Sequence, residues 1–80
     1  MKSNNSRYSY EEARKRAIHE MHRYGRLRLR YEEKFNLTGD IWSKYRGMYY
    51  KDMADRLASS WNVKIIDCSM DRIEVRDLGV

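Results

Sequence analysis

Two histidines three residues apart are the first side chains in this sequence that could bind a metal ion. His19 and His22 stand in the run HEMH, with Glu20 between them. Histidines at this spacing on a helix can share a zinc ion, because imidazole nitrogen is a preferred zinc ligand. The zinc-peptidase motif HExxH separates its histidines by one residue more, and no third ligand lies nearby in the sequence. We therefore predict two solvent-facing histidines, no metal site and no cofactor.

Neither the single cysteine nor the acidic residues near the C-terminus form a catalytic motif. A thiol nucleophile needs a base beside it, and we expect Cys68 to be a small buried side chain at a strand end. Carboxylate groups can hold Mg²⁺ in nucleases, but the acidic residues near the C-terminus belong to a short predicted hairpin without a supporting pocket. They are Asp67, Asp71, Glu74 and Asp77. The sequence also contains no phosphate-binding glycine loop and no dinucleotide fingerprint. It therefore predicts a protein that is not an enzyme and has no catalytic residues.

Basic and aromatic side chains in the first half of the chain are the best indication of function. The net charge is +5, from 17 Lys/Arg and 12 Asp/Glu. Residues 1–34 hold ten basic and five acidic residues, whereas residues 35–80 hold seven of each, which indicates one positive face. Arginine makes forked contacts to phosphate or carboxylate, and tyrosine stacks on bases or lines protein interfaces. The predicted partner-binding residues are Arg14, Lys15, Arg16, Arg23, Arg26, Arg28, Arg30, Lys34, Tyr8 and Tyr50.

A long helix is needed to hold these basic residues on one face, and the sequence predicts such a helix over residues 9–36. Ser9 followed by Glu12 fits a capping box at its start. Apolar residues recur at helical spacing within about 120° of the helical wheel. They are Tyr10, Ala13, Ala17, Met21, Tyr24, Leu27, Tyr31 and Phe35. Most basic residues fall beside this stripe, but Arg28 points into it. We expect Arg28 to extend to the surface, to anchor a partner or to pair with an acid such as Asp52.

The stretch GRLRLRYEEKF, from Gly25, leaves an alternative open because arginine and apolar residues alternate in it. Glycine costs about 1 kcal/mol relative to alanine inside a helix and is common at helix ends. In the alternative, the helix ends at Tyr24 and residues 26–31 form a strand, which gives the element order α-β-α-β-β. Leucine, arginine, glutamate and lysine are all good helix formers, and the stretch has no β-branched residue, so we favour the continuous helix.

The rest of the chain predicts a turn, a second helix and a hairpin. The run NLTGD, residues 36–40, supplies a glycine C-cap and then Thr38 or Asp40 as an N-cap. A second helix follows from about Asp40 to Trp61. Its apolar residues cover more than half of the wheel, so we expect it to contact the first helix on one side and the C-terminal sheet on the other. Residues 63–68 and 72–78 predict a β-hairpin.

The predicted fold class is therefore α+β: an antiparallel pair of long helices followed by a C-terminal β-hairpin packed on them. We expect one small domain over residues 9–80, preceded by a flexible basic tail over residues 1–8. The single cysteine, and a first segment without the apolar core of a secretory signal, predict a cytoplasmic protein. No apolar run approaches the ~20 residues that span a bilayer, so we expect no membrane contact.

Two functions fit this surface. In the first, a small non-enzymatic inhibitor or adaptor docks its basic, tyrosine-rich helix on an acidic or nucleic-acid-binding surface of a larger protein. By size and style alone, and by no motif, such a chain is similar to phage-encoded inhibitors such as anti-CRISPR proteins. In the second, the arginines bind DNA or RNA phosphates without sequence preference. Five glutamates interspersed on the first helix would repel phosphates, so we favour the protein partner. The length of the apolar stripe on this helix also suggests a homodimer.

Overall fold

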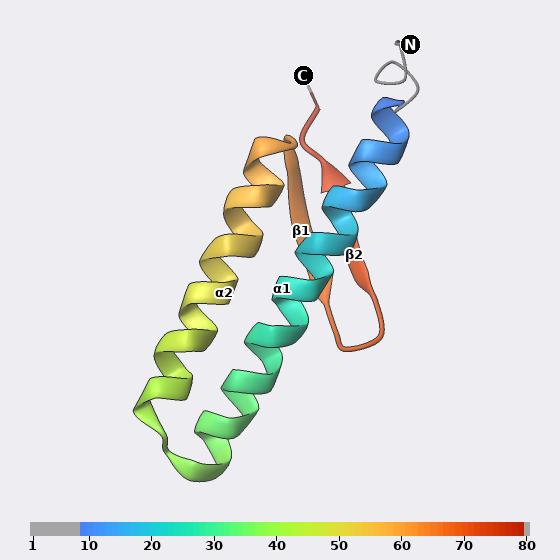
Figure 1. Cartoon of the computed structure of the whole chain (residues 1–80). Coiled ribbons are helices and arrows are strands. Elements are labelled where there is room, and N and C mark those ends of the chain that lie inside the picture. Colours follow the sequence, from blue (N-terminus) through green and yellow to red (C-terminus); the bar gives the residue numbers. More distant parts are fainter. Residues whose placement is uncertain (1–8, 80) are drawn as a thin grey trace, which may run out of the picture.

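The computed structural model describes residues 9–79 and contains two helices followed by two strands (Figure 1). Helix α1 is Tyr10–Thr38, helix α2 is Ile41–Ser60, strand β1 is Val63–Cys68 and strand β2 is Ile73–Asp77. The helices lie side by side and antiparallel, and the strands form an antiparallel two-stranded sheet. This confirms the predicted α+β fold with its C-terminal hairpin. The predicted tail over residues 1–8, which includes Tyr8, lies outside the described residues.

Helix α1 is continuous through Gly25, so the alternative strand over residues 26–31 is wrong. The Ser9 side chain accepts a hydrogen bond from the Glu12 amide at 3.0 Å, as the capping box predicts. The helix ends two residues later than predicted, where Gly39 adopts a left-handed φ of 73° and its N–H donates to the Phe35 carbonyl at 2.7 Å. Helix formers and an unbroken apolar phase therefore outweigh the local alternation and the cost of one glycine.

The turn and the second helix also follow the predicted capping. Asp40 accepts a hydrogen bond from the Trp42 amide at 3.2 Å and another from the Ser43 hydroxyl at 2.9 Å. A side-chain oxygen at this position satisfies amides that have no partner inside the helix. Only two residues separate α1 from α2, which forces the helices to pack against each other as an antiparallel pair.

The core lies where the hairpin crosses the two helices. Its buried members come from three elements: Ala17, Met21, Ala58 and Val63. On α1 the buried side is centred on Ala17, Met21 and Gly25. It is therefore turned slightly away from the tyrosines of the predicted apolar stripe. On β2, Ile73 and Val75 point inward, as their alternation predicts. The resulting core is small, and most of it comes from small side chains.

Two tyrosines of the predicted stripe pack between the helices instead of in the core. The rings of Tyr24 and Tyr31 stack on Tyr50 of α2, with centroid distances of 6.2 Å and 5.8 Å. Aromatic rings stacked at such distances stabilise a fold by more than the burial of their surface area alone. The three tyrosines therefore help to hold α1 and α2 together.

The hairpin packs on α2 as predicted, but it covers only the C-terminal half of this helix (Figure 1). A strand of six residues spans about 20 Å, whereas a helix of 20 residues spans about 30 Å. Because β1 starts at the C-terminal end of α2 and runs back along it, the N-terminal half of α2 has α1 as its only neighbouring element among residues 9–79. The chain is elongated as a result, with principal extents of 52 × 29 × 20 Å.

Two polar contacts hold the hairpin against α1. His22 Nε2 lies 2.8 Å from the Ser69 carbonyl oxygen, so the tautomer with a proton on Nε2 donates a hydrogen bond to the hairpin loop. Arg14 Nη2 lies 2.6 Å from Asp77 Oδ1 at the end of β2. The prediction of two solvent-facing histidines is therefore right for His19 and wrong for His22, because the folded-back hairpin covers the latter.

Candidate binding surface

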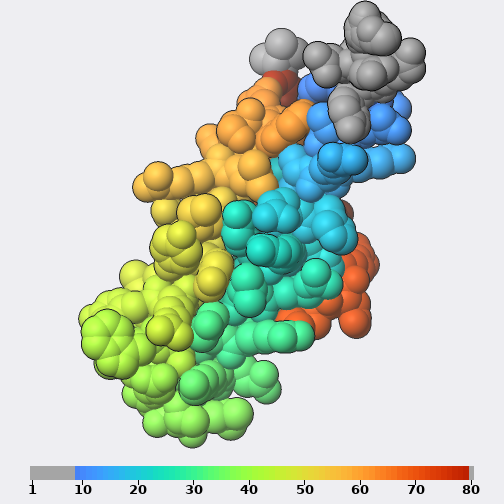
Figure 2. All heavy atoms as spheres, in the orientation of Figure 1, coloured from blue at the N-terminus to red at the C-terminus, as the bar shows by residue number. Residues whose placement is uncertain are grey.

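The outward side of α1 carries a row of basic side chains, here named the basic strip. It consists of Lys15, Arg16, His19, Arg23, Arg26, Arg30 and Lys34. All of these side chains are exposed except Arg26, which is half-buried. At a rise of 1.5 Å per residue, the strip is about 28 Å long. Figure 2 shows atoms of α1, coloured blue to green, along the face in view, with the orange-red hairpin on one side of them. The helix thus brings together most of the predicted basic residues.

Only some of the acidic residues of α1 lie beside the middle of the basic strip. Glu32 pairs with Arg28 on the side that faces α2, with 2.8 Å between Oε2 and Nε. Glu20 lies at the edge of the strip, 3.5 Å from Arg23. Two further glutamates belong to the first turn, where the partial positive charge of the helix end favours them. Only Glu33 is exposed near the C-terminal end of the strip. The middle of the basic strip is therefore less diluted by acids than the sequence suggested.

Two arginines at the centre of the basic strip carry uncompensated charge. Arg26 and Arg30 lie one helical turn apart and have no ion-pair partner among residues 9–79. Like charges at this spacing repel each other by a few tenths of a kcal/mol. Together with Arg23 and the half-buried Leu27, they line a shallow depression on the outward side of α1. The depression therefore offers guanidinium groups around one apolar side chain.

Arg14 and Tyr50, both predicted to bind a partner, have structural contacts instead. Arg14 forms the ion pair with Asp77 that holds β2, and it lies on the hairpin side of α1. Tyr50 is half-buried and stacked between Tyr24 and Tyr31. The sequence placed them on the binding surface because charge and aromaticity alone do not distinguish an outward position from one that faces a neighbouring element.

Arg28 also lies off the basic strip and pairs with an acid, as expected, although not with Asp52, the acid named as an example. It is half-buried in the angle between the helices and pairs with Glu32, four residues later on the same helix. Asp52, the predicted partner, instead pairs with Arg56 at 2.8 Å. A local pair at this spacing needs no rearrangement of the backbone. Arg28 therefore neutralises charge inside the fold and is not free to anchor a partner.

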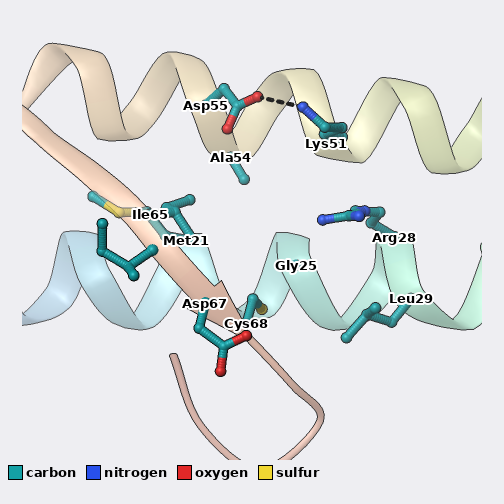
Figure 3. A pocket seen from close by; sticks show the side chains of 11 residues that line it. Met21, Gly25, Arg28, Leu29, Lys51, Ala54, Asp55, Ile65, Asp67 and Cys68 are labelled. Carbon is teal, nitrogen blue, oxygen red and sulfur yellow. Dashed lines mark hydrogen bonds and ion pairs between the residues drawn. The ribbon is translucent and has the colours of Figure 1, made fainter. Parts of the chain in front are cut away.

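A groove of about 300 Å³ lies between α1, α2 and β1 (Figure 3). Its two cationic side chains already have partners, because Arg28 pairs with Glu32 and Lys51 Nζ lies 3.0 Å from Asp55. Cys68 lies at its floor against Gly25, where a Cβ atom would overlap the sulfur. Among its lining residues, the groove therefore has no unpaired cation with which to bind an anionic ligand.

The environment of Cys68 does not activate its thiol. Burial raises its pKa, an effect that the nearby Arg28 charge only partly offsets and that Asp67 adds to. A thiol with a raised pKa stays protonated at neutral pH and is a weak nucleophile. The predicted role of Cys68 as a packing side chain fits these contacts. Among residues 9–79, no group of three His, Cys, Asp or Glu side chains is placed to hold a metal ion.

The sequence prediction missed a second surface, which we name the α2 apolar face. It is the outward side of the first half of α2 and consists of Ile41, Trp42, Tyr45, Met48 and Tyr49, all exposed. Two ring contacts order it, because Trp42 and Tyr45 lie 6.4 Å apart and Tyr49 packs edge-on against Tyr50 at 5.2 Å. The lengths of the predicted elements could have revealed this face, because the predicted strands were too short to cover the whole of α2.

Comparisons with known proteins give no functional assignment. A scan against protein-family models matched no family, and searches of curated proteins and of solved structures found no match. Within the part of the chain that the structure describes, neither helix is long and apolar enough to cross a membrane. The function must therefore be argued from the chemistry of the two surfaces.

Proposed function

We propose that this protein is a non-enzymatic inhibitor or adaptor of the cytoplasm that docks the basic strip of α1 on an acidic surface of a larger protein. The observation that carries this proposal is the row of exposed basic side chains, in which Arg26 and Arg30 have no ion-pair partner within the described part of the chain. Guanidinium groups bind carboxylates through paired hydrogen bonds and are weakly hydrated, which suits a protein interface. The unpaired thiol of Cys68 fits a reducing compartment.

The sign of the charge favours an acidic partner over a nucleic-acid-binding one. Surfaces that bind nucleic acid are themselves positively charged, so they would repel the basic strip. The half-buried Leu27 among the arginines also supports a protein partner, because an apolar contact within a charged rim is typical of protein interfaces. The comparison with phage-encoded inhibitors rests on size and style, and the proposal does not depend on it.

Direct binding of DNA or RNA is a second candidate, which one observation favours. The prediction against it rested on glutamates interspersed along the first helix, but Glu32 faces α2 and Glu20 is paired at the edge of the strip. Phosphates could therefore approach the middle of the strip with only the exposed Glu33 nearby. The tyrosines Tyr24 and Tyr31 stack within the chain and are not available to stack on bases. Such binding would depend on phosphate contacts and would show little sequence preference.

The decisive experiment compares two variants of equal charge. Arg26→Gln/Arg30→Gln removes two positive charges from the basic strip, and Lys64→Gln/Arg76→Gln removes two from the outward side of the hairpin, where the residues are paired across the strands and exposed. The tagged full chain is purified from its native host with and without nuclease. We expect a stoichiometric protein partner that resists nuclease, is lost with the strip variant and is retained with the hairpin variant.

A binding measurement with nucleic acid separates the second candidate from the first. Fluorescence anisotropy with a random DNA duplex and a single-stranded RNA is recorded over a range of salt concentrations. Affinity that falls steeply with salt and is lost in Arg26→Gln/Arg30→Gln, together with no nuclease-resistant partner, would support direct nucleic-acid binding. A partner that binds both variants equally well would contradict the role assigned to the basic strip.

A further inference from the structure

The α2 apolar face contains the largest side chains of its helix, yet they are mostly exposed. Trp42, Tyr45 and Tyr49 are 68%, 55% and 58% exposed. The residues that α2 buries on its other side are all small: Ser43, Gly47, Ala54 and Ala58. An exposed apolar patch bordered by polar residues commonly marks an interaction site. Chains of this length often rely on self-association because their own cores are small.

We propose that the α2 apolar face is the interface of a homodimer. In this dimer the first half of α2 crosses the same segment of a second copy in antiparallel orientation, about a two-fold axis near Tyr45. The proposal concerns a different surface from the basic strip and is independent of what the strip binds.

The available area is sufficient for such a dimer. An aromatic side chain can bury ~150–250 Å², so Trp42, Tyr45 and Tyr49 together expose about 350–400 Å². Ile41 and Met48, which are 45% and 56% exposed, bring the face to roughly 500 Å² per copy. Two copies would bury about 1,000 Å², which is the lower limit for a specific interface. We therefore expect a dimer of micromolar rather than nanomolar affinity.

The charges around the face fit a second copy better than a charged partner. No acidic residue lies between Ile41 and Tyr49. The two cations in this segment point back to α1, since Lys44 lies over the Phe35 ring at 5.7 Å and Arg46 over the Tyr31 ring at 5.9 Å. The face therefore presents no charge at its centre. Two identical copies can meet there without like charges in contact, and a partner recognised by its charge would find none to bind.

The spacing of the apolar residues sets the orientation and the extent of the contact. Ile41, Tyr45 and Met48 follow each other at intervals of four and three, which aligns them along one side of a helix that packs on another helix. In an antiparallel pair centred on Tyr45, Ile41 faces Tyr49 of the other copy and Trp42 faces Met48. Beyond Tyr49 the outward side becomes polar, beginning with Asp52. The contact is therefore confined to the first half of each α2.

The test uses the fact that Tyr45 would meet itself across the two-fold axis. Sedimentation equilibrium of the full chain, from about 1 to about 200 µM, follows dimer formation by mass action. We expect the unmodified chain to dimerise, and Tyr45→Glu and Tyr45→Lys each to raise the dissociation constant at least ~10-fold through like-charge contact. An equimolar mixture of the two variants should form a heterodimer. The control Arg56→Glu changes an exposed charge on the second half of α2 and should leave dimerisation unchanged.

Several outcomes would overturn the proposal. The unmodified chain could remain monomeric at the highest concentration, or Tyr45→Glu could dimerise as tightly as the unmodified chain. Failure of the two folded Tyr45 variants to associate in the mixture would exclude the two-fold axis near this residue. If the chain is monomeric and Trp42→Glu abolishes capture of a different protein, the face belongs to that protein and not to a second copy. If each Tyr45 variant is unfolded alone, a folded heterodimer in the mixture would still support the proposal.

Discussion

Replacing Gly25 by alanine tests the contact between α1 and β1 on which the position of the hairpin depends. In a free helix, this change is favourable by about 1 kcal/mol because glycine is a poor helix former. In this fold, the new Cβ would overlap Cys68 Sγ. Inserting a methyl group into a tightly packed site costs about 1–3 kcal/mol. We therefore expect Gly25→Ala to lower the free energy of unfolding by about 0–2 kcal/mol, in spite of its better helix propensity.

Gly47 provides the matched control, because it is a second buried glycine inside a helix. A Cβ at this position would lie 3.5 Å from Glu32 Cγ and 3.6 Å from both Tyr31 Cβ and the Arg28 carbonyl oxygen. These are ordinary van der Waals distances, so no neighbour has to move. We expect Gly47→Ala to raise the free energy of unfolding by about 0.5–1 kcal/mol.

A double-mutant cycle with Cys68→Ala identifies the atom responsible. Without the sulfur, the nearest neighbour of the new methyl group is the Cβ at position 68, at 3.7 Å, which is an ordinary contact. Gly25→Ala should then stabilise the chain by about 1 kcal/mol, giving a coupling energy of about 1–3 kcal/mol between the two sites. Urea unfolding followed by circular dichroism measures all four chains. If Gly25→Ala stabilises the chain equally with and without the Cys68→Ala substitution, the sulfur does not pack against Gly25 and the placement of β1 on α1 is wrong.

Three further predictions concern the contacts of the hairpin and its cysteine. His22→Ala should cost about 1 kcal/mol and increase amide hydrogen exchange in the loop at Ser69, whereas His19→Ala should change neither. Arg14→Gln should cost only about 0.2–1 kcal/mol in urea unfolding, because its ion pair is partly exposed to solvent; a larger loss would mean that this contact determines the docking of the hairpin. Because burial raises the pKa of Cys68, the unfolded thiol ionises first as pH rises, and stability should fall from the ordinary thiol pKa until the folded pKa is passed. Cys68→Ala should remove the loss of stability at alkaline pH that is due to this thiol. The Cys68 thiol should also react faster with a thiol reagent in urea than in the native chain.

The elements of this fold were predictable from the sequence because local interactions determine them. Ser9, Gly39 and Asp40 act at the helix ends through hydrogen bonds and a left-handed backbone that need only neighbouring residues. The stretch from Gly25 was ambiguous because Leu27 and Leu29 satisfy both a period of two and a wide helical face. The helix prevails because its apolar phase continues over many turns, a signal longer than the local alternation.

The candidate site was less predictable because its composition depends on contacts between distant elements. Arg14 and Arg26 are alike in sequence, but the first pairs with Asp77 of β2 and the second has no ion-pair partner among residues 9–79. His22 was expected in solvent because nothing in the sequence places the hairpin loop above it. The exposure of the α2 apolar face was not predicted, since a wide apolar face indicates a second neighbour without saying whether that neighbour belongs to the same chain.

The two proposed surfaces lie on opposite sides of the helical pair, and this arrangement determines how they would act together. On α1, Met21 and Gly25 point inward while the basic strip points away; on α2, Gly47 and Ala54 point inward while the α2 apolar face points away. A dimer through α2 would therefore hold the helices in the order α1–α2–α2–α1, with a basic strip on each outer edge. Two strips in one rigid body raise the effective concentration of the second contact, so a weak individual contact would suffice for a partner with repeated acidic sites. Tyr45→Glu would then weaken binding to such a partner while leaving the affinity of each single strip unchanged, whereas loss of Arg26 and Arg30 would weaken both.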